Sequence, residues 1–163
     1  MTRVRLFIIL AAVALGPRPA FPTAPPAGQV AWLKYDEALA TARRRGLPLL
    51  IFFRQDNCRP CEVLSEQGFD RPDIAGYVNQ RLAPARVDLD REPELKKKFR
   101  VAGAPTVWFL APDGKEIDFF TGYVPADRLL LILRYVGDGA YRTMTFEEFE
   151  RREAKTATDQ EGK

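Results

Sequence analysis

Apolar and polar residues alternate in blocks along this chain of 163 residues, and four apolar blocks have the length of β-strands. Leu49–Phe53 is continuously apolar, as expected of a central strand that is covered on both faces. Leu82–Leu89 and Val101–Leu110 predict two further strands, the last of them resuming after Pro105. A turn signal at residues 111–114 then predicts that Glu116–Thr121 pairs back as a hairpin strand.

Between these strands, apolar residues recur every three or four positions, which predicts helices. The first helix is expected over Gln29–Arg45, and Gly46 would end it. Its apolar face consists of Trp32, Tyr35, Leu39 and Ala42. Further helices are expected over Cys58–Gln67, from Arg71 onward, and over Glu92–Phe99, Ala126–Val136 and Phe146–Lys155.

The order of these elements predicts an α/β fold. A β-α-β unit followed by a β-β-α unit gives a central mixed sheet of about four strands with helices on both faces, in three layers. The length suits one domain with a proper core, which we place at residues 28–155. Residues 156–163 are expected to form a disordered tail.

The first 27 residues have a different character. Arg3 and Arg5 precede the apolar run Leu6–Leu15, and Gly16 begins a stretch rich in proline. This layout is typical of a signal peptide followed by an extended tether, and predicts export, for example to the periplasm. The run is shorter than the ~20 residues that span a bilayer, although retention as an N-terminal anchor stays open, as does a buried helix.

The same segment accounts for the net charge of +3. Without the three arginines of residues 1–27, 22 basic residues balance 22 acidic ones. The sequence pI near 9.0 therefore gives no reason to expect nucleic acid as a partner. The chain has no histidine, which excludes histidine metal sites and histidine-based activation of a nucleophile.

The two cysteines of the chain, Cys58 and Cys61, stand between the central strand and the helix that follows it. The free N–H groups at the start of a helix favour a thiolate, so Cys58 is the predicted nucleophile. Arg59 adds a positive charge that favours the same thiolate. Cys61 lies within the first turn as the resolving thiol, and the pair is a candidate redox-active disulfide.

The cysteine pair has two alternative roles, a structural disulfide and a metal site. A permanent structural disulfide persists in an oxidising compartment, but a domain of this size and apolar content needs no such staple. Zinc requires four ligands, and no other cysteine or histidine exists in the chain. Two thiolates could at most hold copper(I), so neither a metal nor a cofactor is expected.

A second feature is expected beside the cysteines. If the strand from Thr106 runs antiparallel to Leu49–Phe53, its start faces the end of that strand. Pro105 then lies next to Cys58, although the two are far apart in the sequence.

Several motifs in order make the chain resemble the thioredoxin family. They are residues 50–53 with Cys58-Arg59-Pro60-Cys61, then Val87–Asp90, Val101–Thr106, Gly114–Glu116 and Gly122. The long segment between Glu66 and Leu82 is more similar to exported members, such as the C-terminal domain of the periplasmic thiol:disulfide interchange protein.

The resemblance implies a cis peptide bond at Ala104–Pro105. Without the resemblance, the residues fit an ordinary trans proline that starts a strand equally well. It also implies that Ala104 offers its backbone to an extended substrate segment, with Pro105 and Thr106 as part of the same substrate-binding wall. Pro60 between the cysteines is similar to reducing members of the family.

The chain also departs from the family pattern. Asn57 stands where tryptophan is common, Glu62 where lysine is common, and Phe52 where thioredoxins carry a buried aspartate that assists proton transfer. Glu62 or water would have to take over that transfer. Arg59, Pro60 and Glu62 are therefore the candidate tuning residues.

We expect an exported thiol–disulfide oxidoreductase that acts as a monomer. It would reduce client proteins with disulfides or thiols, using electrons from a membrane-bound donor. The alternative is a non-catalytic binding module or chaperone whose Cys58–Cys61 disulfide is structural.

Overall fold

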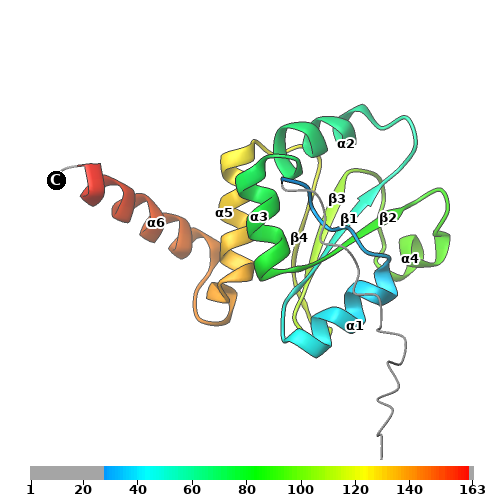
Figure 1. The fold of residues 1–163 in the computed structure, drawn as a ribbon, viewed down its shortest axis with the longest axis horizontal. Helices are drawn as coiled ribbons and strands as arrows, with labels where there is room; N and C mark the ends of the chain where they lie inside the picture. Colours follow the sequence, from blue (N-terminus) through cyan, green and yellow to red (C-terminus); the bar gives the residue numbers. More distant parts are fainter. Residues whose placement is uncertain (1–27, 162–163) are drawn as a thin grey trace, which may run out of the picture.

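The computed structural model describes residues 28–161. The signal peptide and tether expected at residues 1–27 lie outside the described residues, as do residues 162–163. A central sheet separates helices on its two faces (Figure 1). No helix in the described part of the chain is both long and apolar enough to cross a bilayer.

The sheet has four strands in the order β2-β1-β3-β4: β1 (Leu49–Arg54), β2 (Ala83–Asp88), β3 (Thr106–Leu110) and β4 (Glu116–Thr121). Strand β1 pairs parallel with β2 and antiparallel with β3, and β4 pairs antiparallel with β3. Residues 49–53 of the central strand are fully buried, as their continuous apolar pattern predicts. The predicted α/β fold with a mixed sheet of about four strands is therefore confirmed.

Six α-helices and two short helical turns surround this sheet within residues 28–161. Helices α2, α3 and α5 cover one face, and α1 and α4 lie on the other (Figure 1). The bounds are α1 Tyr35–Arg45, α2 Arg59–Leu64, a π-helical turn Ser65–Phe69, α3 Pro72–Arg81, α4 Pro93–Lys98, α5 Ala126–Gly137, a 3-10 turn Ala140–Arg142 and α6 Phe146–Glu161.

Each face of the sheet has its own apolar cluster. We call the face under α2, α3 and α5 the closed face, and its core includes Phe52, Leu64, Phe69, Leu129 and Phe149. We call the face under α1 and α4 the open face, because α4 has no buried residue of its own and leaves part of β3 and β4 uncovered. The core of the open face includes Tyr35, Ala38, Phe53, Phe99 and Val101.

The predicted start of the first helix at Gln29 is wrong. Helix α1 begins at Tyr35, six residues later. The ring of Trp32, which has helical spacing to Tyr35, instead packs on the closed face against Phe69, with 5.1 Å between ring centroids. Leu33 forms a parallel bridge with Ala85 of β2. Tertiary pairing thus overrides a local pattern that fits a helix.

The segment before α1 covers the outer edge of β2. The N–H of Leu33 donates to the carbonyl of Pro84 at 3.0 Å, and the N–H of Arg86 donates to the carbonyl of Leu33 at 3.1 Å. The amide side chain of Asn79 in α3 accepts from the N–H of Ala31 and donates to the carbonyl of Gln29, both at 2.8 Å. This edge of the sheet is therefore paired, whereas β4 forms the other edge.

The single helix predicted over Cys58–Gln67 is wrong at its end. Helix α2 stops at Leu64 and continues into the π-helical turn. Gly68, the residue after the predicted helix, lies inside this turn and packs against α5. A Cβ atom added there would lie 2.8 Å from a methyl carbon of Leu129. Close packing explains the glycine at this position.

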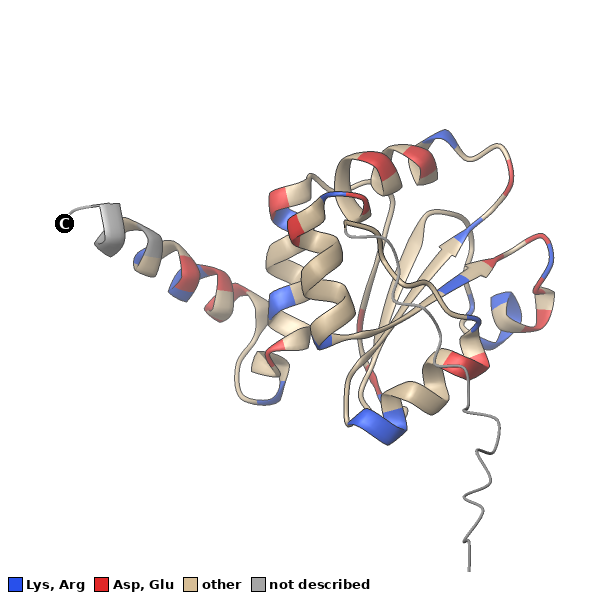
Figure 2. Ribbon diagram, in the orientation of Figure 1, with Lys and Arg blue, Asp and Glu red and all other residues tan. Residues whose placement is uncertain are grey.

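The C-terminal helix is longer than predicted. Helix α6 ends at Glu161 instead of Lys155, so the tail expected to be disordered from Thr156 is helical as far as the structure describes it. It points away from the rest of the domain (Figure 1), and basic and acidic residues alternate along it (Figure 2). Phe149 is its buried anchor, and Glu150 pairs with Arg128 of α5.

Candidate active site

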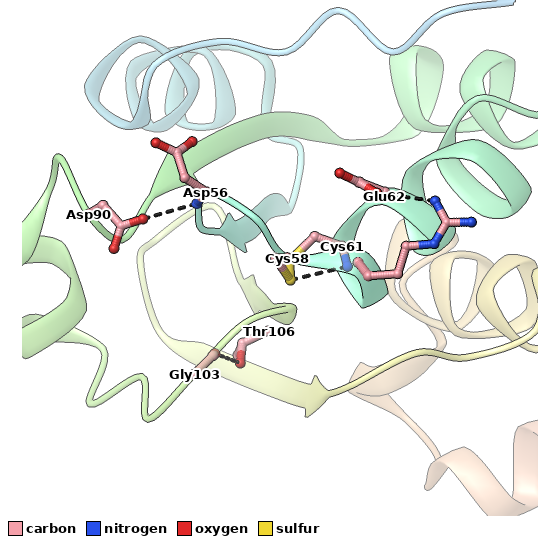
Figure 3. The surroundings of a disulfide bond; sticks show 8 residues. Asp56, Cys58, Cys61, Glu62, Asp90, Gly103 and Thr106 are labelled. Carbon is pink, nitrogen blue, oxygen red and sulfur yellow. Dashed lines mark hydrogen bonds and ion pairs between the residues drawn. A yellow bond between two sulfur atoms is a disulfide. The ribbon is translucent and has the colours of Figure 1, made fainter.

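The two cysteines lie at the junction of β1 and α2 and form a disulfide with an S–S distance of 2.08 Å (Figure 3). Strand β1 ends at Arg54, and the chain turns through Asn57, whose φ of 55° is left-handed. Asparagine adopts this conformation more readily than most residues. Cys58 then caps the N-terminus of α2, at the start of the helix where the sequence places it.

The geometry distinguishes the two sulfur atoms. The N–H of Cys61 donates to Sγ of Cys58 at 3.2 Å. A donor aimed at sulfur favours the thiolate form, so this contact favours Cys58 as the thiolate. Cys58 is 7% exposed and Cys61 is 2% exposed. The arrangement allows Cys58 to act as the attacking thiol and Cys61 as the covered partner.

The loop before β3 lies across from the cysteines. Thr106 pairs with Phe53 in the sheet, so the start of β3 faces the end of β1. The peptide bond Ala104–Pro105 is cis, which confirms the expectation from the family resemblance. In Figure 3, Thr106 lies opposite Cys58, at the end of the sheet where β1 leads into α2. The structure therefore places the loop of Ala104 and Pro105 at the same end of the sheet as the cysteines.

The carbonyls of Gly103 and Pro105 in this loop already accept hydrogen bonds. The hydroxyl of Thr106 donates to the carbonyl of Gly103, and the N–H of Gly122 donates to the carbonyl of Pro105, both at 2.8 Å. Within residues 28–161, neither the N–H nor the carbonyl of Ala104 has a hydrogen-bond partner. Ala104, directly before the cis Pro105, is thus a residue of this loop whose backbone is free to bind an extended peptide.

Arg59 and Glu62 bind one another. Their side chains form an ion pair at 3.1 Å, and both are largely exposed, at 71% and 51%. The carboxylate of Glu62 lies turned toward this ion pair, away from the sulfur atoms (Figure 3). The expectation that Glu62 serves Cys61 as a proton acceptor gains no support from this geometry. Pro60 lies in the first turn of α2, where a missing N–H costs nothing.

Phe52 belongs to an aromatic cluster on the closed face. Its ring lies 5.7 Å from Trp32 and 5.2 Å from Phe69, and it is 1% exposed. Among the described residues, Thr106 is the one buried side chain that is polar or charged. No buried carboxylate accompanies Cys61 in this part of the chain, so its proton has to pass to water or to an exposed group.

Sequence reasoning missed one group of residues near the site. The N–H of Asp56 donates to the carboxylate of Asp90 at 2.9 Å (Figure 3). Arg91 pairs with Asp56 at 3.6 Å. Polar residues that follow two neighbouring parallel strands meet at the same edge of a sheet, which was a usable signal. The contact fixes the loop that leads to Cys58.

A metal centre finds no support in the described residues. They contain no group of three or more histidine, cysteine, aspartate or glutamate side chains that could hold an ion.

Comparisons with known proteins agree with this geometry. The family model described as "Thioredoxin-like domain" matches residues 35–137. The thioredoxin-like protein YosR of Bacillus subtilis, derived from prophage SPbeta, is 33% identical over 88 residues, which cover 52% of this chain and 98% of YosR. The thiol:disulfide interchange protein DsbD of Pseudomonas fluorescens is 31% identical over 98 residues. That match covers 57% of this chain but only 17% of DsbD.

Solved structures show the same fold. A thioredoxin from Thermus thermophilus has 29% identity and a TM-score of 0.61, over 66% of this chain and 87% of the thioredoxin. The oxidised C-terminal domain of DsbD from Neisseria meningitidis has a TM-score of 0.53 at 22% identity, over 65% of this chain and 99% of that domain. The chain therefore belongs to the thioredoxin family, and its Cys-x-x-Cys pair makes it a thiol–disulfide oxidoreductase.

Proposed function

We propose that this protein is exported and reduces disulfides in client proteins, using electrons from a membrane-bound dithiol donor. One observation carries the proposal: the Cys58–Cys61 disulfide caps a helix directly across from a loop whose Ala104 backbone is free. The arrangement joins a reactive thiol to a place where an extended peptide can lie.

In the first step the Cys58 thiolate attacks one sulfur of a client disulfide. The client S–S bond breaks and an S–S bond between Cys58 and the client forms. The other client sulfur leaves as a thiolate and takes a proton from water. The N–H of Cys61, 3.2 Å from Sγ of Cys58, stabilises the attacking thiolate before this step.

In the second step Cys61 resolves the mixed disulfide. Its thiolate attacks Sγ of Cys58, the bond to the client breaks, and the second client thiol is released. The client has then gained two electrons and two protons, and Cys58–Cys61 is a disulfide again. The dithiol donor supplies two electrons and two protons to reduce it for the next cycle.

Ala104 is the proposed binding point for the client backbone. Its free N–H and carbonyl can form two hydrogen bonds to a client strand that runs past Cys58, as in strand addition. Pro105 has no N–H, and its carbonyl accepts from Gly122, so Ala104 and not Pro105 offers the groups that pair. Such pairing is independent of the client side chains and suits varied clients.

The sequence of residues 1–27 and one group of relatives support the cellular setting. The basic start and the apolar run Leu6–Leu15 are typical of a signal peptide. A DsbD from Pseudomonas fluorescens carries the name thiol:disulfide interchange protein. Exchange between partners is the activity that we transfer from that name to this chain.

A redox titration tests the proposal. The purified protein is equilibrated in glutathione buffers of graded ratio, and free thiols are trapped by alkylation. We expect Cys58 and Cys61 to open and close together within the range of known exchange proteins, about −270 to −120 mV. A disulfide that stays closed at every buffer ratio would falsify the proposal and favour an inert structural bond.

Two serine variants separate the roles of the sulfurs. With a disulfide-bonded client, Cys61→Ser is expected to accumulate the Cys58–client mixed disulfide, which non-reducing electrophoresis detects. Cys58→Ser is expected to form no such adduct. Adducts of equal yield in both variants would contradict the assignment of nucleophile and resolving thiol.

A further inference from the structure

We infer that a groove on the open face of the sheet binds the client segment next to its disulfide, and that it selects an apolar side chain followed by an acidic one. The inference rests on the proposed function, because it assigns specificity to the same site. We call this hollow of about 410 Å³ the aromatic groove. It is lined mainly by Phe99, Arg100, Thr106, Trp108, Glu116 and Phe119.

The aromatic groove begins at the loop that faces the cysteines. Thr106, one of the residues that line the groove, follows Pro105 directly and pairs with Phe53 of β1. Residues 100–102 line the groove and come shortly before Ala104 in the chain. A peptide held by the backbone of Ala104 therefore enters the groove within a few residues, at about 3.3 Å of extended chain per residue.

An aromatic shelf forms the floor of the groove. The rings of Trp108 and Phe119, which face each other across β3 and β4, stack at 4.6 Å with an angle of 11° between planes. Phe99 packs against the other side of Trp108 at 5.6 Å. Phe119 is 52% exposed, the largest exposure among the large apolar side chains of the described core and surface. A shelf of this kind suits an apolar client side chain.

The charges at the groove favour an acidic neighbour of that side chain. The charged residues that line the groove are Lys98, Arg100 and Glu116, two basic and one acidic. Lys98 donates to the hydroxyl of Tyr35 at 2.8 Å, whereas Arg100 is exposed and has no ion pair within residues 28–161. A client carboxylate that meets Arg100 makes a charge-assisted hydrogen bond.

The edge of β4 disfavours a different occupant. Gly122 turns its N–H inward to Pro105, so the N–H of Phe119 points outward in the alternating pattern of the strand. That outward N–H already donates to the carboxylate of Asp118 at 2.8 Å. Addition of a strand, including β4 of a second copy, would have to displace this bond and bring a carboxylate to the new interface. The occupant therefore lies on the side chains of the face.

The test uses synthetic peptides in which one cysteine carries a mixed disulfide with a fluorescent thiol. A Leu-Asp pair is placed two to five residues from the cysteine, on either side, and a Leu-Lys series serves for comparison. We expect one register of the Leu-Asp series to be reduced about tenfold faster than its Leu-Lys counterpart, as a difference in kcat/KM.

Three variants assign that preference to the groove. Phe119→Ser is expected to remove it, and Arg100→Glu to reverse it toward Leu-Lys. Tyr141→Ser changes a partly exposed aromatic residue of the 3-10 turn, which lines a different hollow beside the turn of the β3–β4 hairpin, and should leave the preference intact. Absence of a preferred register, or a preference that Phe119→Ser leaves unchanged, overturns the inference.

Two further measurements distinguish the loss of peptide preference from a failure of the redox function. Reduction of oxidised glutathione, which is too small to reach the groove, should be equal in all three variants and the wild type. If the wild type reduces neither glutathione nor any peptide, the proposed function itself fails, and the groove loses its client with it. If Phe119→Ser instead changes only the sedimentation of a dimer, the groove is an interface between copies, which also overturns the inference.

Discussion

The two faces of the sheet are covered to different degrees, and they do different work. On the closed face, Phe52 and Phe69 are buried to 1% and 0% exposure, and Cys58 and Cys61 lie at the edge of their cluster. On the open face, the short α4 leaves Trp108 half-buried and Phe119 exposed. The cysteines thus belong to a filled layer, and the proposed surface for clients belongs to an incomplete one.

This difference follows from what each task requires. Exchange of disulfides needs sulfur atoms held at fixed positions, which close packing of a core provides. Recognition of varied clients needs an exposed apolar surface from which a bound client displaces water. One sheet provides both because α4 is only six residues long and covers little of β3 and β4.

The sharpest test of this comparison is a pair of phenylalanine substitutions. Phe52→Ala is expected to lower the free energy of unfolding by about 3–5 kcal/mol, because it opens a cavity in a filled core. Phe119→Ala should change it by less than about 1 kcal/mol, because the ring is half exposed. Denaturation by urea measures both. Equal losses would mean that the open face is as well packed as the closed one.

A smaller effect is expected from two glycine substitutions on the closed face. Gly68→Ala should destabilise by about 1–3 kcal/mol, since the new Cβ atom lies 2.8 Å from the methyl of the buried Leu129. Gly76→Ala in α3 meets nothing within 4 Å and should stabilise by about 0.5–1 kcal/mol through helix propensity. Thermal unfolding compares the two. The same sign for both would show that the π-helical turn yields more easily than its packing indicates.

The smallest effect concerns the tyrosine contact that each face uses to join two helices. On the closed face, the Tyr77 hydroxyl of α3 donates to Asp138 after α5 at 2.8 Å; on the open face, Lys98 of α4 donates to Tyr35 of α1 at 2.8 Å. Tyr77→Phe should cost about 1 kcal/mol, and Tyr35→Phe less, because Lys98 is exposed and water replaces its partner.

The contact of Tyr77 also has a pH dependence. Burial, and then the hydrogen bond to Asp138, raise the pKa of Tyr77 above its ordinary value. The stabilisation is complete below the unfolded pKa of about 10, and declines as the pH rises above it, because the unfolded state loses the proton first. The difference between wild type and Tyr77→Phe in urea should therefore shrink between pH 8 and pH 11. A constant difference would show that the phenol is not held by the fold.

The strands and the site follow well from the sequence because their signals are local. The apolar run of β1, the hairpin turn after β3, and two cysteines at a strand–helix junction each fit one structure. The position of Pro105 beside Cys58 follows once β3 is placed antiparallel to β1. The cis bond rests on the family resemblance, since no local rule distinguishes it from a trans proline.

The rest depends on contacts that no local pattern reveals. Trp32 has helical spacing to Tyr35, yet it packs toward Phe69 because the chain first pairs with β2. Helix α2 gives way to a π-helical turn where Gly68 meets Leu129. By contrast, the ion pair of Arg59 with Glu62 joins residues three apart on one helix, a spacing at which opposite charges meet.

The segment that covers the edge of β2 has a mechanical consequence. A force that pulls on Gly28 would act first on the two hydrogen bonds of the Asn79 side chain and on the bridge of Leu33. Strand β1, which carries Cys58 at its end, lies one strand further into the sheet. Under tension at the N-terminal end, these outer hydrogen bonds would therefore break before Cys58 was displaced.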